Sequence, residues 1–195
     1  MNPTVRQAIA RIDVIQAEKS SSRGTGALVT ADLVLTAMHV VADRNSPTLS
    51  LYPGTITLAF PDHVTEAHVV DRGWHPTADW ILLRCVTPPP AAPLPLADSV
   101  VDGDNWETYG FPDANPRDGM VQIGTIDNAA GTFEGVAAYQ LFSNQAAAGT
   151  GAPVKGLSGG PVVVDGALVA VMRSSLMREG QNVAGTLYGC PIDLI

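Results

Sequence analysis

The chain has 195 residues, of which 46% are hydrophobic and 15% are charged, which excludes a disordered protein. At this length a globular chain buries roughly 70% of its unfolded surface and needs no metal or disulfide to fold. The net charge of −8 argues against a nucleic acid as partner, and no apolar run approaches the roughly 18 residues of a membrane-spanning helix.

The first segment, Thr4–Ile15, places its apolar residues on one helical stripe, but its last five residues also alternate as a strand does, so both structures remain open. The N-terminus interleaves charged with apolar residues and contains no apolar stretch typical of a secretory signal. We therefore expect a cytoplasmic protein in which Cys85 and Cys190 are reduced thiols.

Most of the remaining chain consists of short runs rich in Val, Ile, Leu and Thr, which Gly, Pro, Asp and Asn separate. The predicted strands are Gly26–Thr30, Asp32–Thr36, Thr55–Phe60, Ala67–Val70, Trp80–Val86, Met120–Ile126, Pro161–Val164, Leu168–Met172 and Val183–Tyr188. Short strands without helices between them predict an all-β barrel or sandwich.

Residues 88–97 interrupt this pattern with a cluster of prolines, five of them within Pro88–Pro95. Proline removes backbone donors and favours the polyproline II conformation. The segment therefore indicates a semi-rigid connector between residues 1–87 and residues 98–195. The second part begins with an acidic stretch, 98–134, whose one basic residue is Arg117. We interpret this stretch as a solvated surface, with a basic partner or substrate as the alternative.

The strongest local motif is Gly156-Leu157-Ser158-Gly159-Gly160-Pro161, which contains the G-x-S-x-G pattern of serine nucleophiles. Glycine lets the backbone turn sharply and lets a substrate carbonyl approach main-chain N–H groups. A glycine-rich hairpin turn is the alternative interpretation. All the histidines, His39, His63, His68 and His75, precede Ser158. An α/β-hydrolase needs its histidine after the serine and is excluded, whereas the order His, Asp, Ser remains.

His39 is the candidate base, because two apolar stretches lead to it and would hold its ring in a rigid, partly desolvated place. A buried core histidine is the alternative. The other histidines match no zinc-ligand spacing, so no metal or other cofactor is predicted.

Asp79 is the candidate partner of His39 among the aspartates Asp43, Asp62, Asp71 and Asp79 that follow it. Strand alternation places Asp79 on the same face as Ile81 and Leu83. A carboxylate there is buried and needs a partner, which a histidine N–H would supply. A turn aspartate at the start of a strand is the alternative.

Together these segments resemble the trypsin-like (chymotrypsin-fold) serine peptidases of the bacterial type. The matching residues are Gly24–His39, Asp79–Leu83 and Gly156–Pro161, with weaker similarity at Tyr109-Gly110-Phe111-Pro112. The resemblance implies two antiparallel β-barrels with the active site in the cleft between them. The first barrel would carry the catalytic histidine and aspartate, and the second would carry the serine.

The resemblance also implies roles for single residues. Ser158 would be the nucleophile, His39 the general base and then acid, and Asp79 the residue that orients His39. The backbone N–H groups of Gly156 and Ser158 would form the oxyanion hole. The implied function is that of a serine endopeptidase that hydrolyses proteins or peptides through an acyl-enzyme.

The substrate-binding residues that the resemblance implies are Ala152, Pro153, Arg173, Ser174 and Ser175. The first two would lie near the floor of the specificity pocket, where no acid supports a preference for Arg or Lys. The last three would form the strand edge that pairs with the substrate. Small residues are common in the family where Arg173 stands, and we expect its side chain to extend to solvent, with a clamp for an acidic substrate group as the alternative.

Leu157 stands where the family commonly has an aspartate that pairs with a new N-terminus after zymogen cleavage. Activity is therefore predicted not to depend on N-terminal clipping. A cytoplasmic protease would need control, which favours a regulated enzyme with a regulatory partner or fused domain, or a protease domain of a longer protein. The alternative function is a latent or non-catalytic binding module on the same fold.

Overall fold

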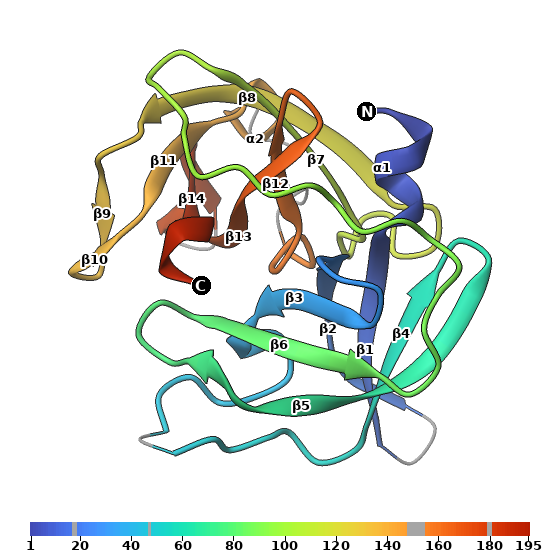
Figure 1. The fold of residues 1–195 in the computed structure, drawn as a ribbon. Helices are drawn as coiled ribbons and strands as arrows, with labels where there is room; N and C mark the ends of the chain where they lie inside the picture. Colours follow the sequence, from blue (N-terminus) through green and yellow to red (C-terminus); the bar gives the residue numbers. More distant parts are fainter. Residues whose placement is uncertain (17–18, 47, 148–154, 179–180) are drawn as a thin grey trace.

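The computed structural model describes residues 1–16, 19–46, 48–147, 155–178 and 181–195, and these form two closed antiparallel barrels, one above the other in Figure 1. The first barrel has the order β1-β2-β3-β6-β5-β4. Its strands are β1 (Ile9–Gln16), β2 (Lys19–Leu28), β3 (Leu33–Ala37), β4 (Thr55–Phe60), β5 (His63–His75) and β6 (Trp80–Cys85).

The second barrel has the order β11-β14-β13-β12-β7-β8. Its strands are β7 (Asn105–Gly110), β8 (Met120–Asn128), β11 (Tyr139–Phe142), β12 (Pro161–Val164), β13 (Ala167–Arg178) and β14 (Gln181–Pro191). The other elements are α1 (Pro3–Gln7), η1 (Met38–Val40), the hairpin strands β9 (Thr132–Phe133) and β10 (Val136–Ala137), α2 (Asn144–Ala147) and η2 (Ile192–Leu194). The predicted all-β fold of two antiparallel barrels is confirmed.

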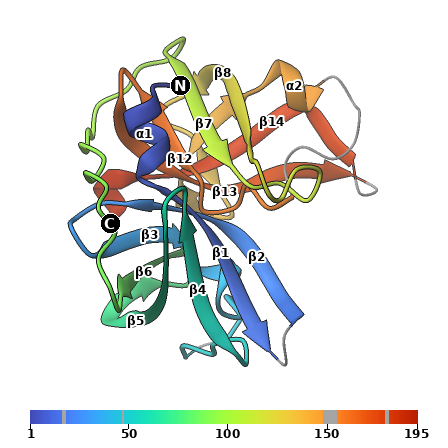
Figure 2. The ribbon, with the colours of Figure 1, turned by 90° about the vertical axis from the view of Figure 1, so that its right-hand side faces the viewer.

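The segment Thr4–Ile15, left open between helix and strand, contains both. Asn2 caps the short helix α1, since its Oδ1 accepts the Thr4 N–H at 2.9 Å, and β1 begins at Ile9. The helical stripe does not continue because β1 pairs with both β2 and β4, which satisfies its backbone on two sides. Figure 2 shows α1 beside the second barrel, while β1 enters the first.

Alternation of apolar residues along the strands fills each barrel. In the first barrel, Ile12, Leu28, Leu35, Leu58 and Leu83 are buried. Trp106, Ile126, Leu141, Val162 and Leu187 are buried in the second. Each such side chain stabilises the fold by about 1.5–3 kcal/mol relative to full exposure. Among the described residues, no helix is both long and apolar enough to cross a membrane.

The proline-rich segment is attached to both barrels through its backbone. The Leu94 N–H donates to the Leu28 carbonyl at 2.9 Å in the first barrel. In the second barrel, Pro95 O accepts the Leu168 N–H at 2.8 Å, and the Ala97 N–H donates to Leu168 O at 3.0 Å. These bonds fix the path of the chain from one barrel to the other.

Candidate active site

His39 and Asp79 meet at the end of the β3–β6 pair in the first barrel. Ala37, the last residue of β3, pairs with Trp80 at the start of β6, so the residues flanking this pair are neighbours. The Asp79 side chain is fully buried. Its Oδ1 accepts the His39 backbone N–H at 3.0 Å, and its Oδ2 lies 2.7 Å from His39 Nδ1. Because a carboxylate only accepts, Nδ1 carries the proton and Nε2 is left as an acceptor.

Asp79 has a strained backbone. Its φ of +61° lies in the left-handed region, which a residue with a side chain rarely occupies. Such a conformation costs on the order of 1–3 kcal/mol and persists where the surroundings enforce it. Here the Asp79 carbonyl accepts the Met38 N–H at 3.1 Å while the carboxylate binds His39, so both ends of the residue are fixed to η1.

The loop that carries Ser158 is held by both barrels. In the second barrel, the Gly159 N–H donates to Met172 O at 2.7 Å on β13. In the first barrel, the Thr25 N–H donates to Ser158 O at 2.8 Å. Thr25 Oγ1 donates to Gly156 O at 3.0 Å and accepts the Phe111 N–H at 3.1 Å. Thr25 therefore positions the serine loop, a role that its place in Gly24-Thr25-Gly26 did not reveal.

Glycine at position 159 allows this tight packing. Its φ is +80°, and a Cβ there would overlap Thr36 Oγ1 and the Thr25 carbonyl oxygen. We expect Gly159→Ala to lower the free energy of unfolding by about 3 kcal/mol or more, since strain and overpacking add. The measurement is urea denaturation. Gly166→Ala is the control, because Gly166 has a φ of +83° but no atom within 4 Å of its added Cβ. Equal losses in the two variants would contradict the packing argument.

The backbone around Ser158 presents donors. Gly156 has a φ of +95°, and its carbonyl oxygen is turned toward Thr25. Within the described part of the chain, the N–H groups of Gly156 and Ser158 have no hydrogen-bond acceptor. Two such donors, one on each side of Leu157, can bind an oxyanion.

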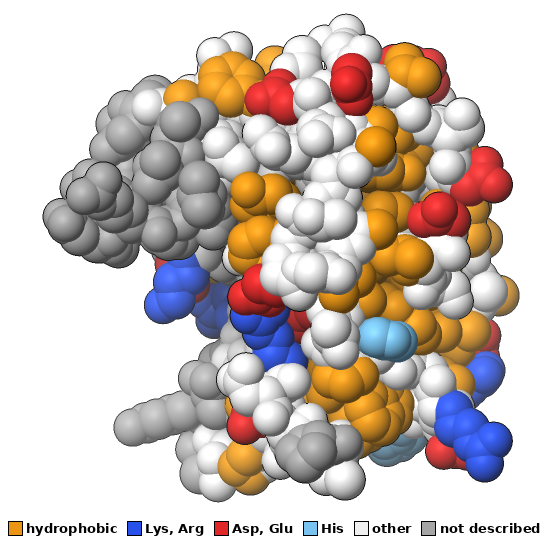
Figure 3. Space-filling model, turned by 90° about the vertical axis from the view of Figure 1, so that its left-hand side faces the viewer, with side chains coloured by type: hydrophobic (Ala, Val, Ile, Leu, Met, Phe, Trp, Pro, Cys, Tyr) orange, Lys and Arg blue, Asp and Glu red, His pale blue; other side chains and the backbone are white. Residues whose placement is uncertain are grey.

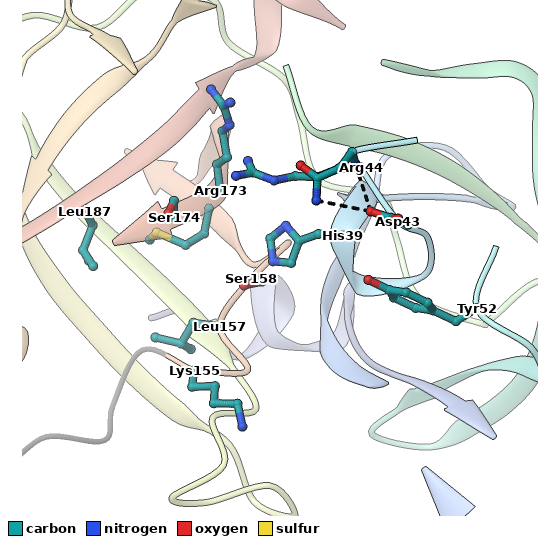
Figure 4. Close-up of a pocket in the computed structure, with 12 residues that line it drawn as sticks. His39, Asp43, Arg44, Tyr52, Lys155, Leu157, Ser158, Arg173, Ser174 and Leu187 are labelled. Atoms are coloured by element: carbon teal, nitrogen blue, oxygen red, sulfur yellow. Dashed lines mark hydrogen bonds between the residues drawn. The ribbon is translucent and has the colours of Figure 1, made fainter. Parts of the chain in front are cut away.

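His39 and Ser158 line one cavity of about 430 Å³. Figure 4 shows the His39 ring beside Ser158, with Leu157 and Leu187 on one side and Tyr52 on the other. Ser174, one of the expected substrate-binding residues, also lines this cavity. The side chain of Ser175, and the whole of Ala152 and Pro153, lie outside the described residues.

Arg173 does not extend to solvent as expected, since its side chain is only 2% exposed. The guanidinium is enclosed because the β9–β10 hairpin covers it. It donates to the carbonyls of Phe133 at 3.2 Å and Thr77 at 2.9 Å, and lies 2.9 Å from Glu134 Oε2. The acidic group that it binds therefore belongs to this chain.

Two of the other histidines and both cysteines make contacts away from Ser158. His63 Nε2 lies 3.0 Å from Thr87 O, and His75 Nδ1 accepts the Ala78 N–H at 3.0 Å. Nowhere among the described residues do three His, Cys, Asp or Glu side chains gather as metal ligands.

Burial raises the pKa of the Cys85 thiol to about 11 and that of Cys190 to about 12. Both thiols stay protonated at neutral pH and are poor nucleophiles.

Known proteins share this architecture. Residues 24–171 match the trypsin-like peptidase domain family. The active form of the Rv3671c protease from M. tuberculosis superposes with a TM-score of 0.72 at 22% identity, covering 98% of this chain and 80% of that one. The HtrA-type protease AlgW with a tripeptide gives 0.73 at 22% identity, covering 98% and 58%.

A serine endoprotease from Yersinia pestis gives a TM-score of 0.72 at 19% identity, covering 98% of this chain and 61% of that one. No curated protein sequence matches the chain. At these identities the solved structures support the fold, while the family match covers most of the chain, including His39, Asp79 and Ser158. The chain therefore belongs to the trypsin-like peptidase domain family and is a serine endopeptidase.

Proposed function

We propose that His39, Asp79 and Ser158 form the catalytic triad of this endopeptidase. The observation that carries the proposal is the His39 ring, which faces the same cavity as Ser158 while its Nδ1 lies 2.7 Å from the buried Asp79 carboxylate. Asp79 fixes the tautomer in which Nε2 can take a proton. It also stabilises the imidazolium that forms when Ser158 attacks.

The reaction follows from these positions. Ser158 Oγ attacks the substrate carbonyl carbon, and its proton passes to His39 Nε2. The oxyanion that forms accepts hydrogen bonds from the N–H groups of Gly156 and Ser158, each worth roughly 3–4 kcal/mol in comparable sites. His39 then protonates the leaving amine, and the peptide bond breaks to give an acyl-enzyme. Water, activated by His39, releases the acyl group by the same steps.

The cavity wall on the Ser158 side supports a substrate preference. Leu157, Met172 and Leu187 line it and are apolar, while Lys155 on the same side is 87% exposed and pairs with Asp113. An apolar side chain before the scissile bond would bury its surface there at about 25 cal/mol per Å². The proposed substrates are therefore proteins or peptides cleaved after an apolar residue.

The direct test is labelling with a fluorophosphonate, which reacts with an activated serine. Intact mass spectrometry should show one adduct on the wild type and none on Ser158→Ala. A peptide library then identifies the residue before the cleaved bond. The proposal is wrong if neither protein is labelled, and the latent binding module would then be favoured.

Leu157 supports an enzyme that needs no activating cleavage. Its side chain is 1% exposed and is apolar, so it cannot form an ion pair with a newly released amine. We expect limited proteolysis near the N-terminus to leave kcat/KM within about twofold or to lower it. The measurement is peptide hydrolysis before and after nicking, with the new N-terminus identified by mass spectrometry. Activation of an inert chain by such a cut would contradict this prediction.

A further inference from the structure

A second positive group lies close to the carboxylate that orients His39. Arg44, on the loop after η1, places Nη1 3.7 Å from Asp79 Oδ2. This is the same oxygen that lies 2.7 Å from His39 Nδ1. The Arg44 side chain is 30% exposed and lines the cavity, whereas the Asp79 carboxylate that it approaches is fully buried. Arg44 and His39 therefore face one acceptor atom.

Glu134 binds the same arginine from the β9–β10 hairpin, which forms a small sheet apart from the two barrels. Its two oxygens accept from Arg44 Nη1 at 3.1 Å and Nη2 at 3.2 Å, a two-pronged pair that fixes the plane of the guanidinium. Glu134 lies in the turn between β9 and β10, where its own φ is +53° and that of Gly135 is +78°. The hairpin thus presents one carboxylate across the cleft to the first barrel.

Arg173 fixes that carboxylate in place. Its Nη2 lies 2.9 Å from Glu134 Oε2, and its guanidinium lies 5.0 Å from the Phe133 ring, which stacks on Tyr188. Nη2 also donates to Thr77 O in the first barrel. Figure 4 shows Arg44 and Arg173 side by side above His39, and Figure 3 shows basic and acidic side chains together at the hollow between the two halves.

The distances indicate how the charges compete. Arg44 is closer to Glu134, at 3.1 Å, than to Asp79, at 3.7 Å. Charges at such distances interact strongly in a partly buried site. Without the Glu134 charge, Arg44 would be free to form a full ion pair with Asp79 Oδ2. Its positive charge would then draw on the same oxygen and weaken the hydrogen bond that Asp79 Oδ2 accepts from His39 Nδ1.

We propose that Glu134 and Arg44 are positioning residues for the His39–Asp79 pair, with Glu134 holding Arg44 and Arg173 so that Asp79 Oδ2 stays available to His39. The inference rests on the proposed triad. Neither residue needs to touch the substrate, and the pair joins the β9–β10 hairpin, which lies outside both barrel sheets, to the His39–Asp79 pair of the first barrel. An acidic substrate group is not required, since Glu134 already supplies the anion.

Other charged or titratable groups also face the dyad. Asp43 and Tyr52 come from the first barrel, and burial, with Asp43 and Asp79, raises the pKa of Tyr52. Cys190 comes from β14, with Asp193 after it, and Lys155 lines the cavity beside Ser158. These groups stay the same in the variants below, but Arg173 also loses the Glu134 charge in Glu134→Gln. The double variant separates the two arginines, because it removes Arg44 while Arg173 still lacks the Glu134 charge.

The test compares log(kcat/KM) against pH for the wild type, Arg44→Gln, Glu134→Gln and the double variant. A positive charge beside the dyad opposes protonation of His39, and a negative charge favours it. In Arg44→Gln the apparent pKa of the acidic limb, below which activity falls, should rise by roughly 0.5–1 pH unit. In Glu134→Gln it should fall by a similar amount. The double variant should return close to the wild type. Glu134→Gln should also lower the plateau about tenfold, because Arg44 then competes for Asp79.

Arg84→Gln is the matched control. Arg84 is 54% exposed on β6, pairs with Asp32 and lies outside the cavity, so removing its charge should leave the limb in place. Arg44→Lys keeps the charge and should restore the wild-type limb. Thermal unfolding confirms that each variant is folded. Shifts in the same direction for Arg44→Gln and Glu134→Gln, or an unmoved limb in both, would overturn the proposal.

A second readout separates this inference from the proposed function. The His39 Nδ1 proton, followed by NMR through a pH titration, reports on the dyad without substrate. Opposite shifts of its titration in the two variants support the network even if the wild type is not labelled by the fluorophosphonate. If the fluorophosphonate labels the wild type but the His39 titration is unshifted in both variants, the proposed triad stands and the positioning role of Arg44 and Glu134 is wrong.

Discussion

Replacing Ser158 by alanine is expected to lower kcat by about 10⁶-fold while KM changes little. The loss is large because the acyl-enzyme route disappears, and only substrate binding and the oxyanion donors remain to accelerate hydrolysis. Ser158 is half-buried at the cavity, so removing its hydroxyl should not affect folding. The measurement is hydrolysis of a fluorogenic peptide with an apolar residue before the cleaved bond.

The control is a double-mutant cycle with His39→Ala. Because the serine and the histidine act as one unit, either single change should cost nearly as much as both together. Independent, additive losses would mean that His39 does not activate Ser158. If Ser158→Ala kept more than about one hundredth of the wild-type activity, a residue other than Ser158 would have to be the nucleophile.

Much of the site could be predicted because its signals are local. Runs of apolar residues predicted the strand that leads to His39 and the strand that follows Asp79, and glycines marked the turn at Ser158. All the predicted runs overlap strands in the structure. Thr4–Ile15 shows the limit, since its stripe fits a helix but pairing with β2 and β4 makes most of it a strand. Such pairing depends on segments distant in the sequence, so the conformational propensities of the local residues cannot predict it.

The ion network beside Asp79 could not be predicted for the same reason. Arg44 and Glu134 are 90 positions apart, and the contact exists only because the β9–β10 hairpin bends over the cleft. Glu134 also falls in the acidic stretch 98–134, which we interpreted as solvated surface. Arg173 was expected to extend to solvent by its residue type, yet a covering hairpin buries it. Charge pairing across elements has no periodicity to detect.

Asp79→Asn is expected to lower kcat/KM by about 10⁴-fold near neutral pH. Asp79 is fully buried and accepts at both oxygens from His39. An asparagine amide group can donate to Nδ1, which would place the ring proton on Nε2 and leave no acceptor for the Ser158 proton. The loss therefore comes from the wrong tautomer, with the backbone in place, and the fluorophosphonate reaction should slow in parallel.

Asp71→Asn is the control for that experiment, because Asp71 also lies between His39 and the connector but is exposed on β5. Its kcat/KM should stay within about twofold of the wild type, since exposed substitutions seldom disturb a distant site. The contacts of Arg44 help to separate an effect on catalysis from an effect on folding. In Asp79→Asn the arginine loses one anion but keeps Glu134, so the fold should survive while catalysis fails. Retention of activity in Asp79→Asn, or its loss in Asp71→Asn, would show that a different carboxylate orients the histidine.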